Sequence, residues 1–252
     1  MMTTAEWEGF CAAREHFRAL CAELSKSLPE LRIEQERLVA ERGGAYYTID
    51  TPVVYNTALD DISRNDAPAL ILVADNPGRR EQSSALRRYL VGPSGKIAEH
   101  FFAREQSLNF DLRKNVIILN KTPIHTPRTV ELRSISGPPS IHNAVIDSQK
   151  KMAHLLSEFY TALRIPVWVI GYSEMRKNGI FAAYTAELAA LVGHGKINAD
   201  DVFFYRHFSM NQFSIDLNKQ RLPRESTVSA LTRIGAAYRT RILQPFYAAH
   251  PS

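Results

Sequence analysis

Four short apolar runs in the 252-residue sequence each lead into residues that can do chemistry. Asp75 and Asn76 follow the first run, Asn120 follows the second, and His207 lies after the fourth. Carboxamide, carboxylate and imidazole groups hold water, transfer protons and stabilise departing anions. Such a set favours hydrolytic chemistry, provided that the fold brings the four side chains together.

The apolar runs are rich in Val, Ile, Leu and aromatic residues and show no polar alternation, as in strands that are buried on both faces of a parallel sheet. They cover residues 69–74, 116–119, 167–170 and 202–205, and stretches with helical spacing lie between them, notably 142–164 and 180–192. This alternation predicts an α/β fold: a three-layer α/β/α architecture with a central four-stranded parallel sheet. Residues at the carboxyl ends of such strands should line one crevice.

Helices are expected at both ends of the chain. Residues 1–42 form a predicted helical N-terminal extension, in which Thr3 and Glu6 have the spacing of a capping box and Pro29 opens a second helical segment. A last amphipathic helix is predicted for 226–247. Since no repeat or linker is present, we expect one domain over residues 1–252.

Composition limits the classes of protein. Thirty-one Lys and Arg residues against 26 Asp and Glu give a net charge of +5, which is compatible with a polyanionic partner. Two cysteines match neither an iron–sulfur nor a zinc pattern, so we expect no metal and no cofactor. With no apolar run of transmembrane length and an acidic N-terminus, we expect no membrane association and an intracellular protein, cytoplasmic or nucleoid-associated, or nuclear in a eukaryote.

Four segments carry a resemblance to a known family. They are ILVADNPG at the first strand, RRYLVGPSGK after it, VIILN at the second strand and HFSMN at the fourth. In this order, over roughly residues 53–215, they resemble the motifs of the uracil-DNA glycosylase superfamily, and the upstream VVYNTALDD resembles its single-strand-selective monofunctional class. The expected fold is therefore uracil-DNA glycosylase-like.

The resemblance implies a role for each motif residue. Asn76 would hold the attacking water, His207 would donate a hydrogen bond to the departing base, and Asn120 would read the pyrimidine edge. Gly78 would leave the pocket open to a modified or bulkier base. Asp75 competes with Asn76 for the role of water-activating base.

The chain also departs from the family motifs. Ala74 replaces a glycine, and Phe208 replaces the proline that follows the histidine. Leu90 stands where the family has the phenylalanine that stacks on the flipped base, with Tyr89 beside it. Leu90 and Tyr89 are therefore the expected contacts to the base.

Further residues are candidates for DNA contact. They are Arg79, Lys121 and Lys219 for phosphates, Ser94 at a helix start that offers free backbone N–H groups, Ser209 beside the fourth motif's histidine, and Met210. Met210 and Phe213 stand where relatives insert an apolar wedge, although core packing explains Phe213 equally well. Each motif also has a purely structural interpretation: Asn-Pro-Gly as a turn, His207 as a hydrogen-bonding residue, and Asn120 as a strand-end cap.

Taken together, the motifs predict a metal-free monofunctional DNA glycosylase, a hydrolase of N-glycosyl bonds that acts in base excision repair. It would flip uracil or a related damaged base out of single-stranded or mispaired DNA and cleave it by water attack, as a monomer. The alternative is a superfamily member that binds DNA or a nucleobase without turnover. A nucleotide-using enzyme of similar architecture is a weaker option, because no glycine-rich phosphate fingerprint follows the first strand.

Overall fold

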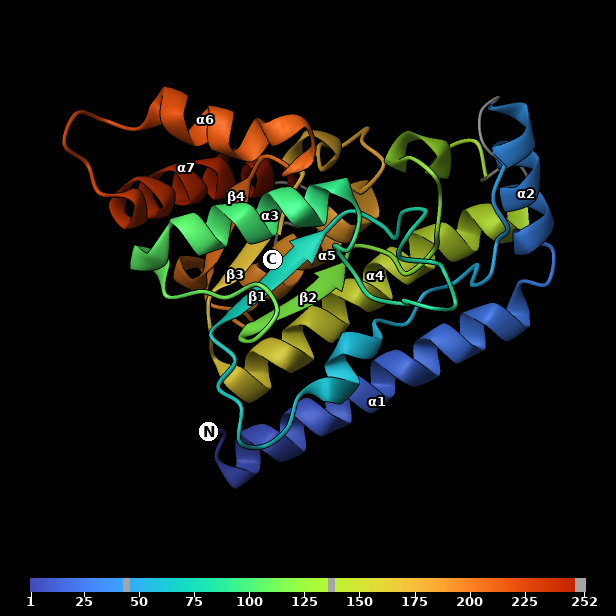
Figure 1. Ribbon diagram of the computed structural model, residues 1–252, viewed down its shortest axis with the longest axis horizontal. Coiled ribbons are helices and arrows are strands. Elements are labelled where there is room, and N and C mark those ends of the chain that lie inside the picture. Colours follow the sequence, from blue (N-terminus) through green and yellow to red (C-terminus); the bar gives the residue numbers. More distant parts are fainter. Residues whose placement is uncertain (43–45, 136–138, 248–252) are drawn as a thin grey trace.

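Four parallel strands form the centre of the molecule (Figure 1). The structure, a computed structural model, describes residues 1–42, 46–135 and 139–247. The strands are β1 (Leu70–Ala74), β2 (Val116–Asn120), β3 (Val167–Ile170) and β4 (Val202–Tyr205), in the order β2-β1-β3-β4. All three strand pairs are parallel and nearly every strand residue is buried, which confirms the expected strands and the parallel sheet.

The strand order creates a crevice where the loops that follow β1 and β3 diverge. Asp75 and Gly171 meet there. A Cβ atom on Gly171 would lie 2.3 Å from Oδ1 of Asp75, and Gly171 has a φ of +82°. Only glycine combines that backbone conformation with that close approach, so Gly171 makes room for the Asp75 carboxylate.

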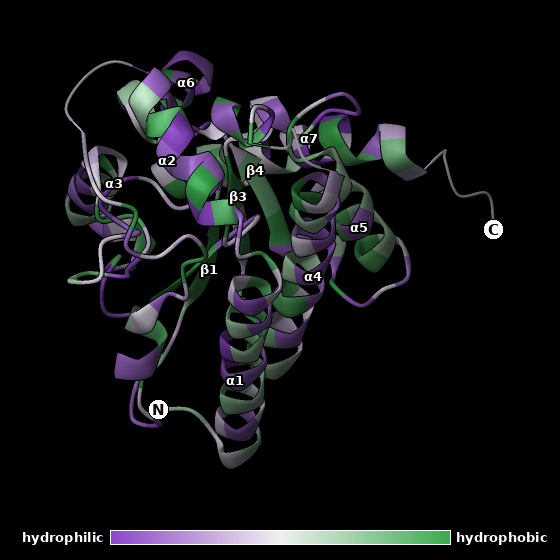
Figure 2. Ribbon diagram, turned by 90° about the vertical axis from the view of Figure 1, so that its right-hand side faces the viewer, coloured by the Kyte–Doolittle hydropathy of each residue, from purple (hydrophilic) through white to green (hydrophobic). Residues whose placement is uncertain are grey.

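Helices cover both faces of the sheet and confirm the three-layer α/β/α fold. Helix α3 (Pro93–Arg104) lies on one face, and α4 (Pro139–Leu163) and α5 (Ala182–Gly193) lie on the other (Figure 2). Helix α7 (Thr227–Tyr247) packs against β4 and α5, and α6 (Gln212–Gln220) packs against α7. Short 3-10 turns connect these elements at Thr57–Asp61, Gln106–Leu108, Thr129–Leu132, Tyr172–Glu174, Ala199–Asp201 and Ser209–Asn211.

The N-terminal helices belong to the core. Helix α1 (Thr4–Ser27) begins with the predicted capping box, in which Thr3 and Glu6 bond each other's backbone N–H groups. It packs along α4, with the rings of Phe10 and Phe159 5.6 Å apart. Helix α2 (Leu31–Glu41) follows Pro29 as expected. Its buried Gln35 donates to the carbonyls of Pro52 and His125, which ties the helix to the loop after β2.

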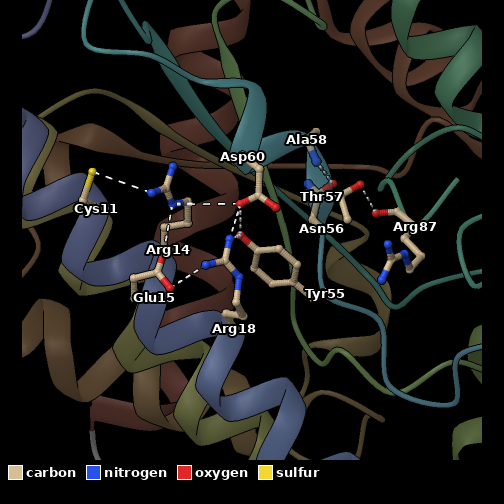
Figure 3. A network of polar contacts seen from close by, with 10 residues as sticks. All are labelled: Cys11, Arg14, Glu15, Arg18, Tyr55, Asn56, Thr57, Ala58, Asp60 and Arg87. Atoms are coloured by element: carbon tan, nitrogen blue, oxygen red, sulfur yellow. Dashed lines mark hydrogen bonds and ion pairs between the residues drawn. The ribbon is translucent and has the colours of Figure 1, made fainter.

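A polar network links α1 to the segment before the sheet (Figure 3). Arg18 forms an ion pair with Asp60 over 2.6 Å, and Tyr55 donates to the same carboxylate. The next residues hold the segment that precedes α3: the backbone N–H of Thr57 donates to the carbonyl of Arg87. Through this network, α1 supports a loop that forms one wall of the site described below.

In the described ranges, no helix is both long enough and apolar enough to cross a bilayer.

Candidate functional site

A cavity of about 1020 Å³ opens at the carboxyl ends of the strands. Asp75 and Asn76 after β1, Asn120 at the end of β2 and His207 after β4 all line it. The fold therefore brings together the four side chains with which the sequence argument began. The full lining is Arg42, Tyr47, Thr48, Asp50, Ala74, Asp75, Asn76, Gly78, Arg79, Arg80, Glu81, Gln82, Ser83, Leu86, Leu90, Gly92, Pro93, Ser94, Asn120, Pro127, Thr129 and His207.

Asn76 is held in one orientation. Its amide nitrogen donates to the hydroxyl of Thr126 over 2.8 Å and lies 3.4 Å from the carbonyl of Ile124. The hydroxyl of Thr126 donates its only proton to the carbonyl of Arg128 over 2.9 Å, so the hydroxyl oxygen must accept from Asn76. No described residue donates to Oδ1 of Asn76, which is left to accept a hydrogen bond within the cavity.

His125 supports the turn that carries Asn76. Its Nδ1 lies 2.8 Å from the carbonyl of Pro77, and its Nε2 lies 3.2 Å from the hydroxyl of Tyr47. A carbonyl can only accept, so Nδ1 carries the proton and Nε2 accepts from Tyr47. Burial lowers the pKa of His125 to about 4, so this neutral form persists at pH 7. Motif reasoning missed His125 and Thr126, although both stand in the short run after Asn120.

Asp75 takes part in a buried ion pair. Its Oδ1 lies 2.6 Å from Nζ of Lys121, which also donates to the carbonyl of Ile170 over 2.6 Å. The Lys121 side chain is fully buried, and this burial lowers its pKa whereas Asp75 raises it. The expected contact between Lys121 and DNA is therefore wrong: the residue points under the cavity floor, where it neutralises Asp75.

His207 presents a defined proton to the cavity. The backbone N–H of Ser209 donates to Nδ1 of His207 over 3.1 Å, so in the neutral ring the proton resides on Nε2. Burial lowers the pKa of His207; Asp75 opposes that shift and Lys121 adds to it. The ring is therefore a neutral donor at pH 7.

Asn120 is buried beside Ala74, its register partner on β1. Its amide nitrogen is shielded from solvent and has no hydrogen-bond partner among the described residues. A buried polar atom without a partner costs about 1–3 kcal/mol. At the wall of a cavity this cost is recovered when a ligand supplies the missing acceptor. The amide nitrogen of Asn120 can therefore donate a hydrogen bond to a ligand in the cavity.

Leu90 lines the cavity in a left-handed conformation with a φ of 52°. Gly95 packs directly against the Leu90 carbonyl oxygen, since a Cβ atom on Gly95 would lie 1.5 Å from it. Arg113 donates a hydrogen bond to the same carbonyl. Tyr89, the neighbour expected to contact the base, is only 1% exposed and donates to the carbonyl of Val54. That expectation is wrong, because Tyr89 packs in the core and lies outside the cavity.

Glu81 joins two walls of the cavity, a role that the motifs did not indicate. Its carboxylate accepts from the backbone N–H of Gly78 over 2.6 Å, and it lies close enough to the N–H groups of Leu90 and Val91 for them to favour its charged form. Burial raises the pKa of this carboxyl group. Glu81 therefore fixes the Asn76 turn relative to the Leu90 loop.

Gly78 and Ser94 line the cavity as expected. A Cβ on Gly78 would find its nearest neighbour 3.8 Å away, so this position leaves room in the cavity. Ser94 is the second residue of α3, whose N-cap Gly92 supplies no side-chain acceptor. The first backbone N–H groups of α3 are therefore available to an anion.

Other expected DNA contacts lie outside the cavity. Met210 is 79% exposed and, with Asn211, adopts a left-handed conformation that projects from the loop after His207. Ser209 is half-buried beside His207, and Lys219 is exposed near the end of α6. Phe208 has a φ of −69°, the value that a proline would impose, so its replacement of the family proline leaves the backbone path intact.

Charge at the cavity favours an anion. Arg79 and Arg80 line it, are exposed, and form no ion pair among the described residues. The three lining carboxylates each have a partner: Asp50 accepts from the N–H and hydroxyl of Ser84, Asp75 pairs with Lys121, and Glu81 accepts from the backbone N–H of Gly78. Free positive charge therefore faces the cavity. Of the three carboxylates, Asp75 is neutralised by Lys121, whereas Asp50 and Glu81 accept hydrogen bonds from neutral groups.

Among the described residues, no group of three or more His, Cys, Asp and Glu side chains is placed to hold a metal ion. The arrangement offers a free amide oxygen at Asn76, an Nε2–H donor at His207 and an unpartnered amide at Asn120. Comparison of the sequence with protein-family models and with curated proteins finds no match.

Proposed function

We propose that the protein is a monofunctional DNA glycosylase that hydrolyses the N-glycosidic bond of uracil or a related damaged base. The observation that carries this proposal is the fixed orientation of Asn76, whose Oδ1 is free in a cavity that also contains the Nε2–H of His207 and the amide of Asn120. Water, leaving group and base edge each find a matching group there.

The reaction needs no further reactant. A water molecule that donates to Oδ1 of Asn76 attacks the anomeric carbon of the flipped nucleotide, and the bond from that carbon to the base nitrogen breaks. The electron pair of that bond leaves with the base, whose developing negative charge is stabilised by the Nε2–H of His207. The attacking water keeps one proton as the new sugar hydroxyl and releases the other to solvent, and the departing base anion takes up a proton from solvent. The products are an abasic sugar and the free base.

Asn76 is a better candidate than Asp75 for holding the water. The carboxylate of Asp75 already accepts from Lys121 over 2.6 Å and packs against Gly171, so it is a poor base. The uncommitted Oδ1 of Asn76 supports the opposite assignment for that residue. Asp75 and Lys121 instead act on His207 with opposite charges: Asp75 raises the pKa of His207 and Lys121 lowers it.

DNA as the substrate is supported by charge and shape at the cavity mouth. Arg79 and Arg80 suit phosphates, as do the free N–H groups at the start of α3. Met210 projects an exposed apolar side chain, as expected of a wedge that fills the gap left by a flipped base. Such an activity belongs inside the cell, where DNA is found.

A catalytically inactive nucleic-acid binder is the second candidate, and Leu90 favours it. An aliphatic side chain there stacks on a flipped base less well than an aromatic ring. The replacement of the family proline by Phe208 does not favour this alternative in the same way, because the φ of Phe208, −69°, is one that a proline also adopts.

One experiment separates the two candidates. Oligonucleotides that contain a single uracil, hypoxanthine, xanthine or hydroxymethyluracil are incubated with the protein, treated with alkali and resolved by length. Scission at the modified position by the native chain but not by Asn76→Ala supports the glycosylase. Binding without scission on all four substrates would make the protein a binder, and the absence of both would overturn each proposal.

A further inference from the structure

The cavity is larger than one nucleobase requires. At about 1020 Å³ it matches the upper end of pockets that enclose a whole drug-sized ligand, about 300–1,000 Å³. Asn76, Asn120 and His207 occupy the end formed by the strands. Another wall comes from the segment after α2, which contributes Tyr47 and Thr48. A flipped base bound to the strand ends leaves this second wall uncovered.

Tyr47 is the one Phe, Tyr or Trp residue among the described residues that line the cavity. Its ring is held from beneath: the hydroxyl donates to Nε2 of His125 over 3.2 Å, and the two rings meet edge-on with centroids 6.0 Å apart. His125 in turn bonds the carbonyl of Pro77. The ring is therefore a fixed aromatic surface that is tied to the turn of Asn76.

Arg79 lies over this ring. Its guanidinium carbon is 4.7 Å from the centroid of the Tyr47 ring, and its side chain makes no hydrogen bond or ion pair with a described residue. An exposed arginine with a free fork above an aromatic ring can stack on a planar group and pair with a neighbouring anion. A nucleotide has both parts, a planar base and a phosphate.

We propose that Tyr47 and Arg79 form a second nucleobase subsite, which takes the unpaired nucleotide next to the one that enters the Asn120 pocket. This proposal rests on the proposed function, since it assumes a nucleic-acid strand in the cavity. A base within a duplex has both faces covered by its neighbours, so only an unstacked nucleotide can reach Tyr47. Single-stranded DNA is therefore the preferred form of the substrate.

The test is a binding measurement that does not depend on turnover. Short single-stranded oligonucleotides with one uracil are prepared with an abasic spacer at each neighbouring position in turn, and their dissociation constants are measured. Loss of one base should weaken binding to the native chain by about tenfold or more at a single position, as expected for a lost base–aromatic stack. The same spacer should leave the dissociation constant of the Tyr47→Leu variant almost unchanged. The Tyr47→Phe variant should show the same loss of affinity as the native chain.

Tyr46 supplies a matched control, because it is the neighbouring tyrosine, is 66% exposed and does not line the cavity. Tyr46→Leu should leave the spacer pattern unchanged. Arg79→Gln, at an exposed position, tests the subsite without touching the support from His125, and it should reduce the spacer effect severalfold.

Two results would overturn the subsite. One is a native chain whose affinity is insensitive to the spacer at every position. The other is a Tyr47→Leu variant that weakens all oligonucleotides equally and keeps the spacer effect, since that would make Tyr47 only a support for His125. Failure of the proposed function has a different signature: no scission of any substrate, whatever the spacer pattern in binding.

Discussion

The amide nitrogen of Asn76 donates to the hydroxyl of Thr126 over 2.8 Å, and this contact decides which end of the Asn76 side chain serves the cavity. Thr126 can accept because it donates to a backbone carbonyl, that of Arg128. The turn alone would allow either orientation of the amide. The residue that fixes it comes from the loop after β2, 50 positions further along the chain.

Asn76→Ala should lower the single-turnover rate of base release by about 100-fold or more, because the water loses the group that positions it. Affinity for the oligonucleotide should change little. Thr126→Val should give a smaller loss, since it keeps Asn76 itself and removes the acceptor that orients the amide, together with the bond from Thr126 to Arg128. Asp75→Asn is the comparison variant. A larger loss in Asp75→Asn than in Asn76→Ala would transfer the catalytic role to Asp75.

His207→Ala should slow release of uracil more than release of a halogenated uracil, since a hydrogen-bond donor matters most for the poorer leaving group. Because burial lowers the pKa of His207 below its usual 6.5, the neutral donor is present at pH 7 and persists as the pH falls through 6.5. The native rate should therefore show no loss from protonation of His207 until lower pH. Equal slowing of both substrates in the variant would assign His207 a structural role.

Stability should fall in acid because of His125. Its pKa is lowered from 6.5 to about 4 by burial, so the unfolded chain binds a proton more readily than the folded chain in this range. The unfolded state therefore gains as the pH falls below 6.5, and the free energy of unfolding should drop by about 3 kcal/mol between pH 7 and pH 4 from this group. Urea unfolding across this range measures the drop.

His125→Gln is the matching variant for that experiment. It is less stable at pH 7, because it loses the bond to Tyr47 or to Pro77, but it should show a flatter pH dependence than the native chain. An unchanged pH dependence in the variant would show that other groups cause the acid sensitivity.

Lys121→Met should destabilise the fold by about 3–5 kcal/mol, because it leaves the Asp75 carboxylate without its buried partner. The double variant Lys121→Met with Asp75→Asn should recover much of that loss. Chemical denaturation of the four proteins gives the coupling between the two residues.

The same Lys121 variant tests the corrected placement of this residue. Its side chain is fully buried, so the folded protein should keep the native salt dependence of DNA binding. A salt slope reduced by about one phosphate contact would instead place Lys121 at the DNA surface.

The sequence by itself determined the sheet and the edge of the sheet, at the carboxyl ends of its strands, where the candidate site lies. The four uninterrupted apolar runs suit strands of a parallel sheet, because such a sheet is covered on both faces and buries these segments completely. The residues after Ala74, Leu119 and Tyr205 then share one edge of it. The capping box at Thr3 could also be predicted from the sequence, since both of its partners lie within one helical turn.

Tertiary structure alone decided what each side chain at that edge does. Lys121 looked like a surface cation from its neighbours in the sequence. The end of β3 places the carbonyl of Ile170 at its amine, the end of β1 places the carboxylate of Asp75 there, and together they bury it. Tyr47 lies in none of the sequence motifs. It enters the site because His125 holds it, from 78 positions away. Contacts between segments so distant in sequence depend on chain packing, and local patterns of residue type carry no record of them.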